Sequence, residues 1–282
     1  MRSLVSALCA GLLTVAALLV GTPAGATSLS ENTENTENTE NTENTENYVA
    51  LGDSYAAGTG AGDYGDSGSC MRSANGFAPL WAAANSPASF ANVTCGGATT
   101  DDVLGGQVDA LKEDTSLVSI AIGGNDVGFA DVMTTCTLGS DQSCVDKVEE
   151  AKTAARETLP AKLDTTYAEI KKRSPQARVV VLGYPRVFVS GSADCSMSET
   201  KRTALNGAAD ELSTVIEGRV GAAGMTYSDV RDEFDGHGVC TDAAWIHGVR
   251  PNLGESYHPN ADGQKSGYLP AFEGAVGVRA AR

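Results

Sequence analysis

Apolar residues along the chain fall into short continuous runs, and amphipathic segments lie between several of them. Five of these runs are typical of buried strands, because they are short and end at glycine, proline or polar residues. They are residues 48–51, 90–94, 117–122, 178–184 and 225–230. Strands that alternate with helices in this way predict an α/β fold, in which helices flank a central parallel sheet.

Three amphipathic segments separate these runs. Residues 76–84 place Phe77 and Trp81 at helical spacing, and residues 198–219 carry a similar apolar face. Residues 143–172 are charged and helical in pattern, but a proline at position 160 interrupts them. Because proline cannot donate the hydrogen bond that a helix interior needs, we expect two helices or one kinked helix there.

The first 26 residues predict a secretory signal peptide. Arg2 supplies a positive charge, residues 12–20 are almost wholly apolar, and Ala24-Gly25-Ala26 has the small-x-small form of a cleavage site. A retained membrane anchor is the less favoured alternative, because the apolar run is shorter than the ~20 residues that a spanning helix needs. We therefore expect a secreted, extracellular protein whose mature chain starts near Thr27.

A Glu-Asn-Thr triplet then repeats from residue 31 to residue 47 without any apolar side chain. Such a segment buries nothing that would offset the entropy of ordering its backbone. We interpret residues 27–47 as a disordered linker rather than a specific binding repeat. Residues 48–282 are enough for one sizeable α/β domain, and no second linker divides them.

Acidic residues outnumber basic ones, 36 to 20. Without Arg2 and the six repeat glutamates, the balance is 19 basic against 30 acidic residues, a net charge of −11. This charge disfavours nucleic acid and anionic membrane surfaces as partners. We expect no nucleic-acid partner, no stable membrane insertion and a monomer.

Six cysteines remain once Cys9 is removed with the leader. In an exported chain they predict three disulfides, for which 15 connectivities exist. A metal site is the alternative, but the chain has no CxxC and only three histidines. Disulfides are therefore the favoured interpretation.

Chemically useful residues follow three of the predicted strands. Ser54 follows the first in Gly-Asp-Ser, Gly97 the second and Asn125 the third, while His258 lies in a late loop. Each of these sites taken alone could be an ordinary turn or a solvated loop residue. Because parallel strands bring their carboxyl ends to one edge of a sheet, all four residues can meet there.

Together they suit a serine hydrolase. A hydroxyl is a poor nucleophile near neutral pH, so His258 would act as general base for Ser54. The oxyanion that forms needs donors already in place, and the backbone N–H groups of Ser54 and Gly97 and the side-chain amide of Asn125 are the candidates. No GxSxG elbow surrounds any serine, which disfavours an α/β-hydrolase.

Four blocks occur in the order found in the GDSL, or SGNH, hydrolase family, which residues 48–282 resemble. They are Gly-Asp-Ser-Tyr at 52–55, Cys-Gly-Gly-Ala-Thr-Thr at 95–100, Gly-Gly-Asn-Asp at 123–126 and Ser-Tyr-His-Pro-Asn at 256–260. Cys-Met-Arg-Ser at 70–73, Leu-Gly-Tyr-Pro-Arg at 182–186 and Trp245-Ile246 extend the likeness. The chain is most similar to the secreted actinobacterial, Streptomyces-type lipases, esterases and phospholipases with three disulfides.

The resemblance implies a three-layer α/β/α flavodoxin-like fold, ester hydrolysis through a Ser54 acyl-enzyme, and no metal or organic cofactor. It favours pairing each cysteine with its neighbour: Cys70–Cys95, Cys136–Cys144 and Cys195–Cys240. Many members have Asp three residues before the histidine, where this chain has Glu255. Glu255 is thus a candidate orienting acid for His258, but we favour a backbone carbonyl near residues 255–256 and a Ser–His dyad.

The sequence indicates the reaction, ester hydrolysis, more clearly than the class of substrate. A lipase, a short-chain esterase and a phospholipase A are all compatible with the motifs, and the substrate would be a small-molecule or lipid ester. A carbohydrate O-acetylesterase would share the same machinery with a different pocket. A non-catalytic extracellular binding module, with the repeat as its stalk, is a less favoured alternative.

Overall fold

Five parallel strands form one sheet in the order β2-β1-β3-β4-β5. The computed structural model describes residues 45–191 and 195–277, so the predicted signal peptide and most of the predicted linker lie outside the described residues. The strands are β1 (Asn47–Gly52), β2 (Ser89–Asn92), β3 (Leu117–Ala121), β4 (Arg178–Leu182) and β5 (Thr226–Ser228). This order is that of flavodoxin-like proteins, and it confirms the predicted parallel α/β fold.

Burial along the strands follows their positions in the sheet. Every residue of β3 is buried, because this strand lies between β1 and β4. In β2, by contrast, Ser89 and Phe90 are exposed, as expected at the edge of the sheet. Val49 of β1 pairs with Val118 on one side and Ala91 on the other, which places β1 inside the sheet.

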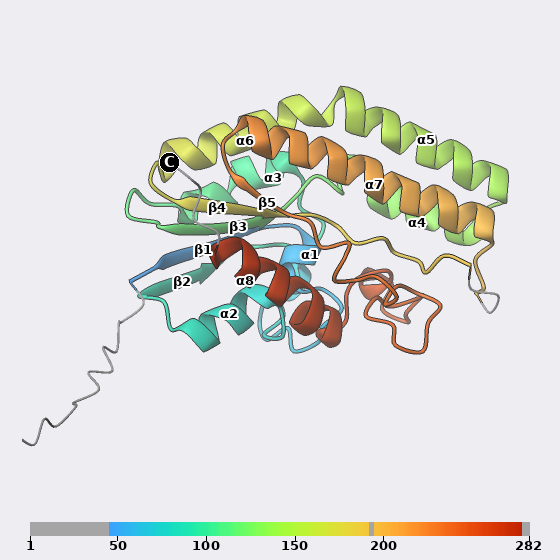
Figure 1. The fold of residues 1–282 in the computed structure, drawn as a ribbon, viewed down its shortest axis with the longest axis horizontal. Coiled ribbons are helices and arrows are strands. Elements are labelled where there is room, and N and C mark those ends of the chain that lie inside the picture. Colours follow the sequence, from blue (N-terminus) through green and yellow to red (C-terminus); the bar gives the residue numbers. More distant parts are fainter. Residues whose placement is uncertain (1–44, 192–194, 278–282) are drawn as a thin grey trace, which may run out of the picture. The chain divides into compact units, whose positions relative to one another are not determined.

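Helices cover both faces of the sheet, and Figure 1 shows α2 and α8 on one face and α3, α6 and α7 on the other. The short α1 lies at the carboxyl ends of the strands. The α-helices are α1 (Ser54–Ala57), α2 (Phe77–Asn85), α3 (Thr100–Gly105), α4 (Phe129–Leu138), α5 (Asp141–Glu157), α6 (Leu159–Arg173), α7 (Glu199–Ala222) and α8 (Leu269–Gly277). Short 3-10 turns span Gly68–Cys70, Gln107–Ala110 and Leu253–Glu255, and a π-helical turn spans Gly263–Tyr268.

The helices predicted from the sequence are all present, with small shifts of their ends. The interrupted segment is two helices, α5 and α6, and Pro160 stands in the first turn of α6, where its missing N–H costs nothing. Ser198 caps α7 by accepting from the N–H of Lys201. Neither α4 nor α8 was predicted as a helix. The ten-residue α4 has no side-chain cap, and α8 contains Pro270 and two glycines, so local sequence signals are weak there.

Packing against the sheet explains why α8 is helical in spite of its sequence. Phe272 is fully buried and its ring lies 5.6 Å from that of Tyr48 on β1. The same ring lies 5.4 Å from Phe77 and 5.8 Å from Trp81, both on α2. Burial of large aromatic side chains outweighs weak helix propensity at this site.

The folded unit includes the last two residues of the predicted linker. Asn47 is the first residue of β1, and its N–H donates to Ser116 Oγ over 2.9 Å. Glu46 forms an ion pair of 2.9 Å with Arg178 at the start of β4. The fold therefore begins slightly before Tyr48, the first residue of the predicted domain.

Three disulfides join Cys70 to Cys95, Cys136 to Cys144 and Cys195 to Cys240. These are the pairs that the family resemblance implies. The first ties the loop after α1 to the loop that carries Gly97, and the second ties α4 to α5. Within residues 45–191 and 195–277, no helix is long and apolar enough to cross a membrane.

Candidate active site

Ser54 stands at a sharp turn where β1 ends and α1 begins. Gly52 has a φ of +122°, and a Cβ atom there would lie 2.3 Å from the carbonyl oxygen of Ala121. Only glycine permits this approach, which brings the end of β1 against the end of β3. The Asp53 N–H donates to the same Ala121 carbonyl over 2.9 Å. The turn therefore places Ser54 at the carboxyl edge of the sheet, where the central strands β1 and β3 end.

Asp53 shapes this turn from inside the protein. Its Oδ1 accepts from the Tyr55 N–H over 2.9 Å, which caps α1. Its Oδ2 accepts from the Tyr184 hydroxyl over 2.5 Å. Burial raises the pKa of the Asp53 carboxyl to about 7. The role of Tyr184 was not predicted, although the block at 182–186 places it just after β4 at the same edge.

His258 lies against the Ser54 hydroxyl. Its Nε2 is 2.7 Å from Ser54 Oγ, and its Nδ1 is 3.0 Å from the carbonyl oxygen of Ser256. A carbonyl only accepts hydrogen bonds, so Nδ1 carries the proton and Nε2 is free to accept the Ser54 proton. Burial lowers the pKa of His258 to about 4, partly offset by the Ser256 carbonyl. The imidazole is therefore neutral near pH 7.

Glu255 has other partners. Its carboxylate accepts from the Tyr64 hydroxyl over 3.1 Å and from Asn252 Nδ2 over 3.1 Å. The group in contact with His258 Nδ1 is the backbone carbonyl of Ser256, which is the arrangement that we favoured from the sequence. Charge from Glu255 is only a minor influence on the pKa of His258.

Buried hydrogen bonds tie the histidine loop to the serine helix. The Tyr55 hydroxyl donates to the carbonyl of Tyr257, the residue before His258, over 2.7 Å. Gln264 is fully buried and bridges two helices, because its Nε2 donates to the Tyr55 carbonyl and its Oε1 accepts from the Phe77 N–H. These contacts hold His258 and Ser54 in fixed relation, although the two residues are 204 positions apart.

The loops that carry Gly97 and Asn125 are held together. Asn125 Nδ2 donates to the carbonyl of Ala98 over 2.9 Å. The buried Asp126 carboxylate accepts from the N–H and the hydroxyl of Thr100, over 3.0 and 2.6 Å. Gly97 is exposed, has a φ of +80°, and no atom lies within 4 Å of where its Cβ would be. The structure thus brings together the residues that the sequence placed after β2 and β3.

A pocket opens beside Ser54 and Asn125. Its other walls are largely apolar and come from α4, α5, α7 and the segment after β4. They include Phe129, Val132, Met133, Ala151, Ala155, Pro185, Val187, Leu205, Ala208, Ala209 and Leu212. The sequence did not locate this pocket, because its residues lie on helices whose inner faces meet only in the folded protein.

The other two histidines have separate contacts. His247 Nε2 lies 2.8 Å from the Gly60 carbonyl, and the His237 ring stacks on Trp245 with its Nδ1 2.8 Å from the Ala243 carbonyl. In the part of the chain that the structure describes, no group of three or more His, Cys, Asp or Glu side chains is arranged to hold a metal ion.

Comparison with known proteins places the chain among bacterial ester hydrolases in sequence and fold, as three matches illustrate. Lipase 1 of Streptomyces coelicolor is 52% identical over 231 residues, which are 81% of this chain and 86% of that protein. The crystal structure of phospholipase A1 from Streptomyces albidoflavus NA297 matches with a TM-score of 0.79 and 49% identity, over 81% of this chain and 98% of that one. The extracellular lipase of Streptomyces rimosus matches with a TM-score of 0.80 and 46% identity, over 82% of this chain and 99% of that one.

Residues 50–265 match the GDSL-like Lipase/Acylhydrolase family, and this range contains Ser54, Gly97, Asn125 and His258. The match covers most of the chain, and the fold agrees with that of the solved relatives. The chain therefore belongs to the GDSL-like lipase/acylhydrolase family and is a carboxylic ester hydrolase.

Proposed function

We propose that this protein is an exported serine lipase or phospholipase A that hydrolyses esters of medium- and long-chain fatty acids. The observation that carries the proposal is the contact of 2.7 Å between Ser54 Oγ and His258 Nε2 beside a mostly apolar pocket. A mostly apolar pocket beside a nucleophile suits an acyl chain. The lipases and the phospholipase A1 among the relatives support the same substrate class.

The reaction begins with proton transfer from Ser54 to His258. Because Nδ1 donates to the Ser256 carbonyl, Nε2 takes the Ser54 proton as the hydroxyl oxygen attacks the ester carbonyl. His258 then donates this proton to the departing alcohol, which leaves an acyl-enzyme on Ser54. A water molecule, deprotonated by the same imidazole, hydrolyses the acyl-enzyme and restores the serine.

Three donors stabilise the oxyanion of each tetrahedral intermediate. They are the backbone N–H groups of Ser54 and Gly97 and the amide of Asn125. Asn125 uses one of its two amide hydrogens on the Ala98 carbonyl, so the other serves the oxyanion. The contacts that fix these loops before substrate binds avoid reorganisation during the reaction.

Covalent labelling with a fluorophosphonate probe tests the nucleophile. We expect stoichiometric labelling of the wild-type protein and none of Ser54→Ala, with both variants folded by circular dichroism. Absence of labelling in the folded wild type would contradict a catalytic role and favour a binding module.

Hydrolysis of p-nitrophenyl esters from acetate to palmitate, together with a panel of phospholipids, tests the substrate class. We expect kcat/KM to be higher for chains of eight carbons or more than for acetate. Cleavage restricted to acetyl esters would instead indicate a carbohydrate O-acetylesterase.

We also infer that residues 1–26 are a signal peptide and residues 27–47 a linker between the exported N-terminus and the domain. Three disulfides support export, because they persist in oxidising compartments. Intact mass measurement of protein secreted by a bacterial host tests this inference. We expect a mature chain that begins near Thr27, and full-length protein retained on the membrane would contradict it.

A further inference from the structure

Four residues after β4 separate the pocket beside Ser54 from a second pocket. Pro185 and Val187 line the pocket beside Ser54, whereas Arg186 and Phe188 line a second pocket. This alternation is that of an extended chain, whose successive side chains point to opposite sides. We call residues 185–188 the partition, because they form a wall between the two pockets.

Helix α7 has the same two-sided arrangement. Its apolar residues, among them Leu205 and Leu212, line the pocket beside Ser54. Its polar residues Asn206 and Asp210 line the second pocket. The helix therefore contributes apolar side chains to one pocket and polar side chains to the other, and the polar ones contact the partition.

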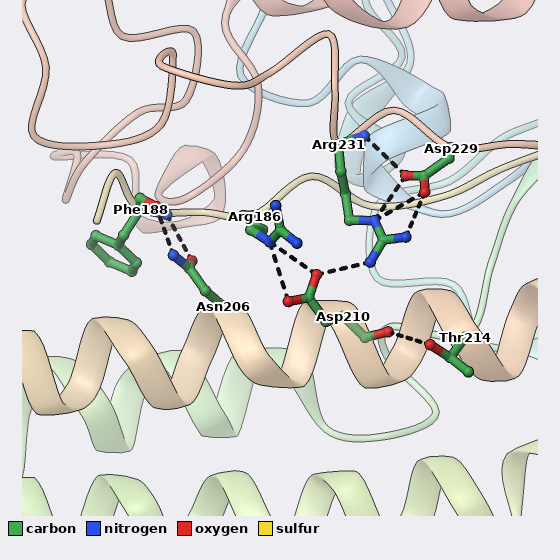
Figure 2. Close-up of polar contacts among 7 residues, drawn as sticks. All are labelled: Arg186, Phe188, Asn206, Asp210, Thr214, Asp229 and Arg231. Atoms are coloured by element: carbon green, nitrogen blue, oxygen red, sulfur yellow. Dashed lines mark hydrogen bonds and ion pairs between the residues drawn. The ribbon is translucent and has the colours of Figure 1, made fainter. Parts of the chain in front are cut away.

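Asn206 holds the backbone of the partition with two hydrogen bonds. Its Oδ1 accepts from the Phe188 N–H over 3.1 Å, and its Nδ2 donates to the Phe188 carbonyl over 2.7 Å (Figure 2). Asn206 is only 7% exposed, so both bonds are shielded from water. Satisfying both polar groups of one residue ties the end of the partition to α7 with a defined separation.

Asp210, one turn further along α7, holds the partition through Arg186. Its carboxylate accepts from Arg186 Nε over 2.9 and 3.2 Å and from Arg231 Nη1 over 2.8 Å (Figure 2). Arg231 is itself fixed by Asp229, which accepts from its Nε over 2.9 Å and from its Nη2 over 2.5 Å. Asp210 therefore connects the partition, α7 and the segment after β5.

The opposite edge of the partition is held by backbone hydrogen bonds. The Val239 N–H donates to the Val187 carbonyl over 2.8 Å, and the Val189 N–H donates to the Val239 carbonyl over 3.2 Å. A Cβ atom on Gly238 would lie 2.9 Å from the carbonyl carbon of Phe188. With one edge fixed in this way, Asn206 and Asp210 determine the distance between the partition and α7.

We propose that Asn206 and Asp210 are positioning residues for acyl-chain specificity, because they set the width of the pocket beside Ser54 without contacting substrate. This inference rests on the proposed function and assigns that pocket to the acyl chain. An acetyl group occupies only the space next to Ser54 Oγ. A long acyl chain extends between the partition and α7, so only long-chain esters depend on that width.

Kinetics with p-nitrophenyl acetate and laurate test the proposal in Asn206→Ala and Asp210→Ala. We expect the ratio of kcat/KM for laurate to that for acetate to fall by about tenfold in Asn206→Ala, mainly through KM. The fall should be about threefold in Asp210→Ala, because the Arg186–Asp210 pair is partly exposed and weaker than a buried contact. Active-site titration with the fluorophosphonate gives the concentration of reactive enzyme in each preparation, and the measured rates are divided by that concentration.

Two matched variants separate positioning from general stability. Thr214→Ala removes a hydrogen bond of 2.9 Å to the Asp210 carbonyl within α7 and leaves the partition untouched (Figure 2). Its laurate-to-acetate ratio should equal that of the wild type. Asp210→Glu keeps a carboxylate for Arg186 and Arg231, so its ratio should recover towards the wild-type value.

An unchanged ratio in both alanine variants would overturn the proposal, and so would an equal loss for both esters. Failure of the proposed function is distinguishable, because it appears in the wild-type protein: the fluorophosphonate does not label it, or it hydrolyses acetate but not laurate. Failure of the positioning proposal appears only in the variants, when the wild-type protein does hydrolyse laurate.

Discussion

The carboxyl edge of the sheet and the pocket beside it are built in different ways. At the edge, Ser54 and His258 are held by backbone conformations and buried hydrogen bonds, such as that from the Tyr55 hydroxyl to the Tyr257 carbonyl. The pocket is lined mainly by small and aliphatic side chains on α4, α5 and α7, including Ala151, Ala155 and Leu212. Polar groups at the edge have defined partners, whereas the pocket is defined by the spacing of packed helices.

This difference separates reaction chemistry from substrate choice. In the proposed mechanism, a change at the edge removes a group that acts on the transition state, so it should lower kcat for every ester. A change in the pocket alters the space for an acyl chain, so its effect depends on chain length. Substitutions at the edge and in the pocket should therefore have effects that differ in size and in their dependence on chain length.

Loss of His258, the proposed general base, should have the largest effect. We expect His258→Ala to lower kcat by about 10⁴-fold or more for both acetate and laurate esters, because Ser54 then has no proton acceptor. The double variant with Ser54→Ala should be no worse than either single variant, since the two residues act as one unit. Burst and steady-state kinetics measure this, and a loss that differs between the two esters would contradict the separation.

Asn125 should have the next largest effect. We expect Asn125→Ala to lower kcat by about 10²- to 10³-fold with little change in KM, because in the proposed mechanism its amide donates to the oxyanion and not to the bound ester. An aspartate side chain has no N–H donor, so Asn125→Asp should be equally impaired. Steady-state kinetics with esters of several chain lengths check this. A loss of less than tenfold in kcat would contradict a role for Asn125 in the oxyanion hole.

The pH dependence should reflect the burial of His258. Its pKa is lowered to about 4, and only the neutral imidazole accepts a proton, so kcat/KM should stay near its plateau at pH 5 and fall below about pH 4. If the pKa of the histidine were unshifted at about 6.5, kcat/KM at pH 5 would already be about 30-fold below its plateau. Rate measurements from pH 3.5 to 8, with circular dichroism to confirm folding, distinguish the two. An acid limb centred near pH 6.5 would contradict the lowered pKa.

A substitution in the pocket should change the enzyme's preference for the length of the acyl chain. Ala155 is buried on α5 and lines the pocket, so Ala155→Phe should fill part of the acyl space. We expect kcat/KM for laurate to fall by about tenfold or more, while that for acetate stays within about twofold. Thr153→Phe places the same side chain on the exposed side of α5 and should change neither value. An equal loss for both esters in Ala155→Phe would contradict the separation.

Glu255 should have the smallest effect. Its carboxylate contacts Tyr64 and Asn252, and the Ser256 carbonyl occupies His258 Nδ1, so Glu255→Gln should change kcat by less than about twofold. A loss approaching that of His258→Ala would instead establish a Ser–His–Glu triad. The same kinetic assay checks both variants side by side.

Much of the fold could be predicted from the sequence because its strands are short apolar runs with clear ends. The run before Ser54 and the run before Asn125 correspond to β1 and β3, and Pro160 marks the break between α5 and α6. By contrast, α4 and α8 could not be predicted, because their helical structure depends on contacts distant in sequence, such as those of Phe272.

The residues at the edge could be named from the sequence for a similar reason. Each follows a strand or lies in a short distinctive block, and glycines at 52 and 97 are required by local backbone conformation. Their partners could not be named. Tyr184 lies 131 positions from Asp53, and Gln264 lies 209 positions from Tyr55, so only folding brings them together.

The sequence by itself determined the parallel α/β fold and named candidates for the nucleophile, the base and the oxyanion donors, because these depend on periodicity and on motifs of a few residues. Only the tertiary structure decided that the Ser256 carbonyl contacts His258, that a mostly apolar pocket opens beside Ser54, and that Asn206 and Asp210 contact residues 186–188. The physical reason is that a pocket is the space left between packed helices. Its size depends on contacts among residues far apart in the chain, which no local pattern records.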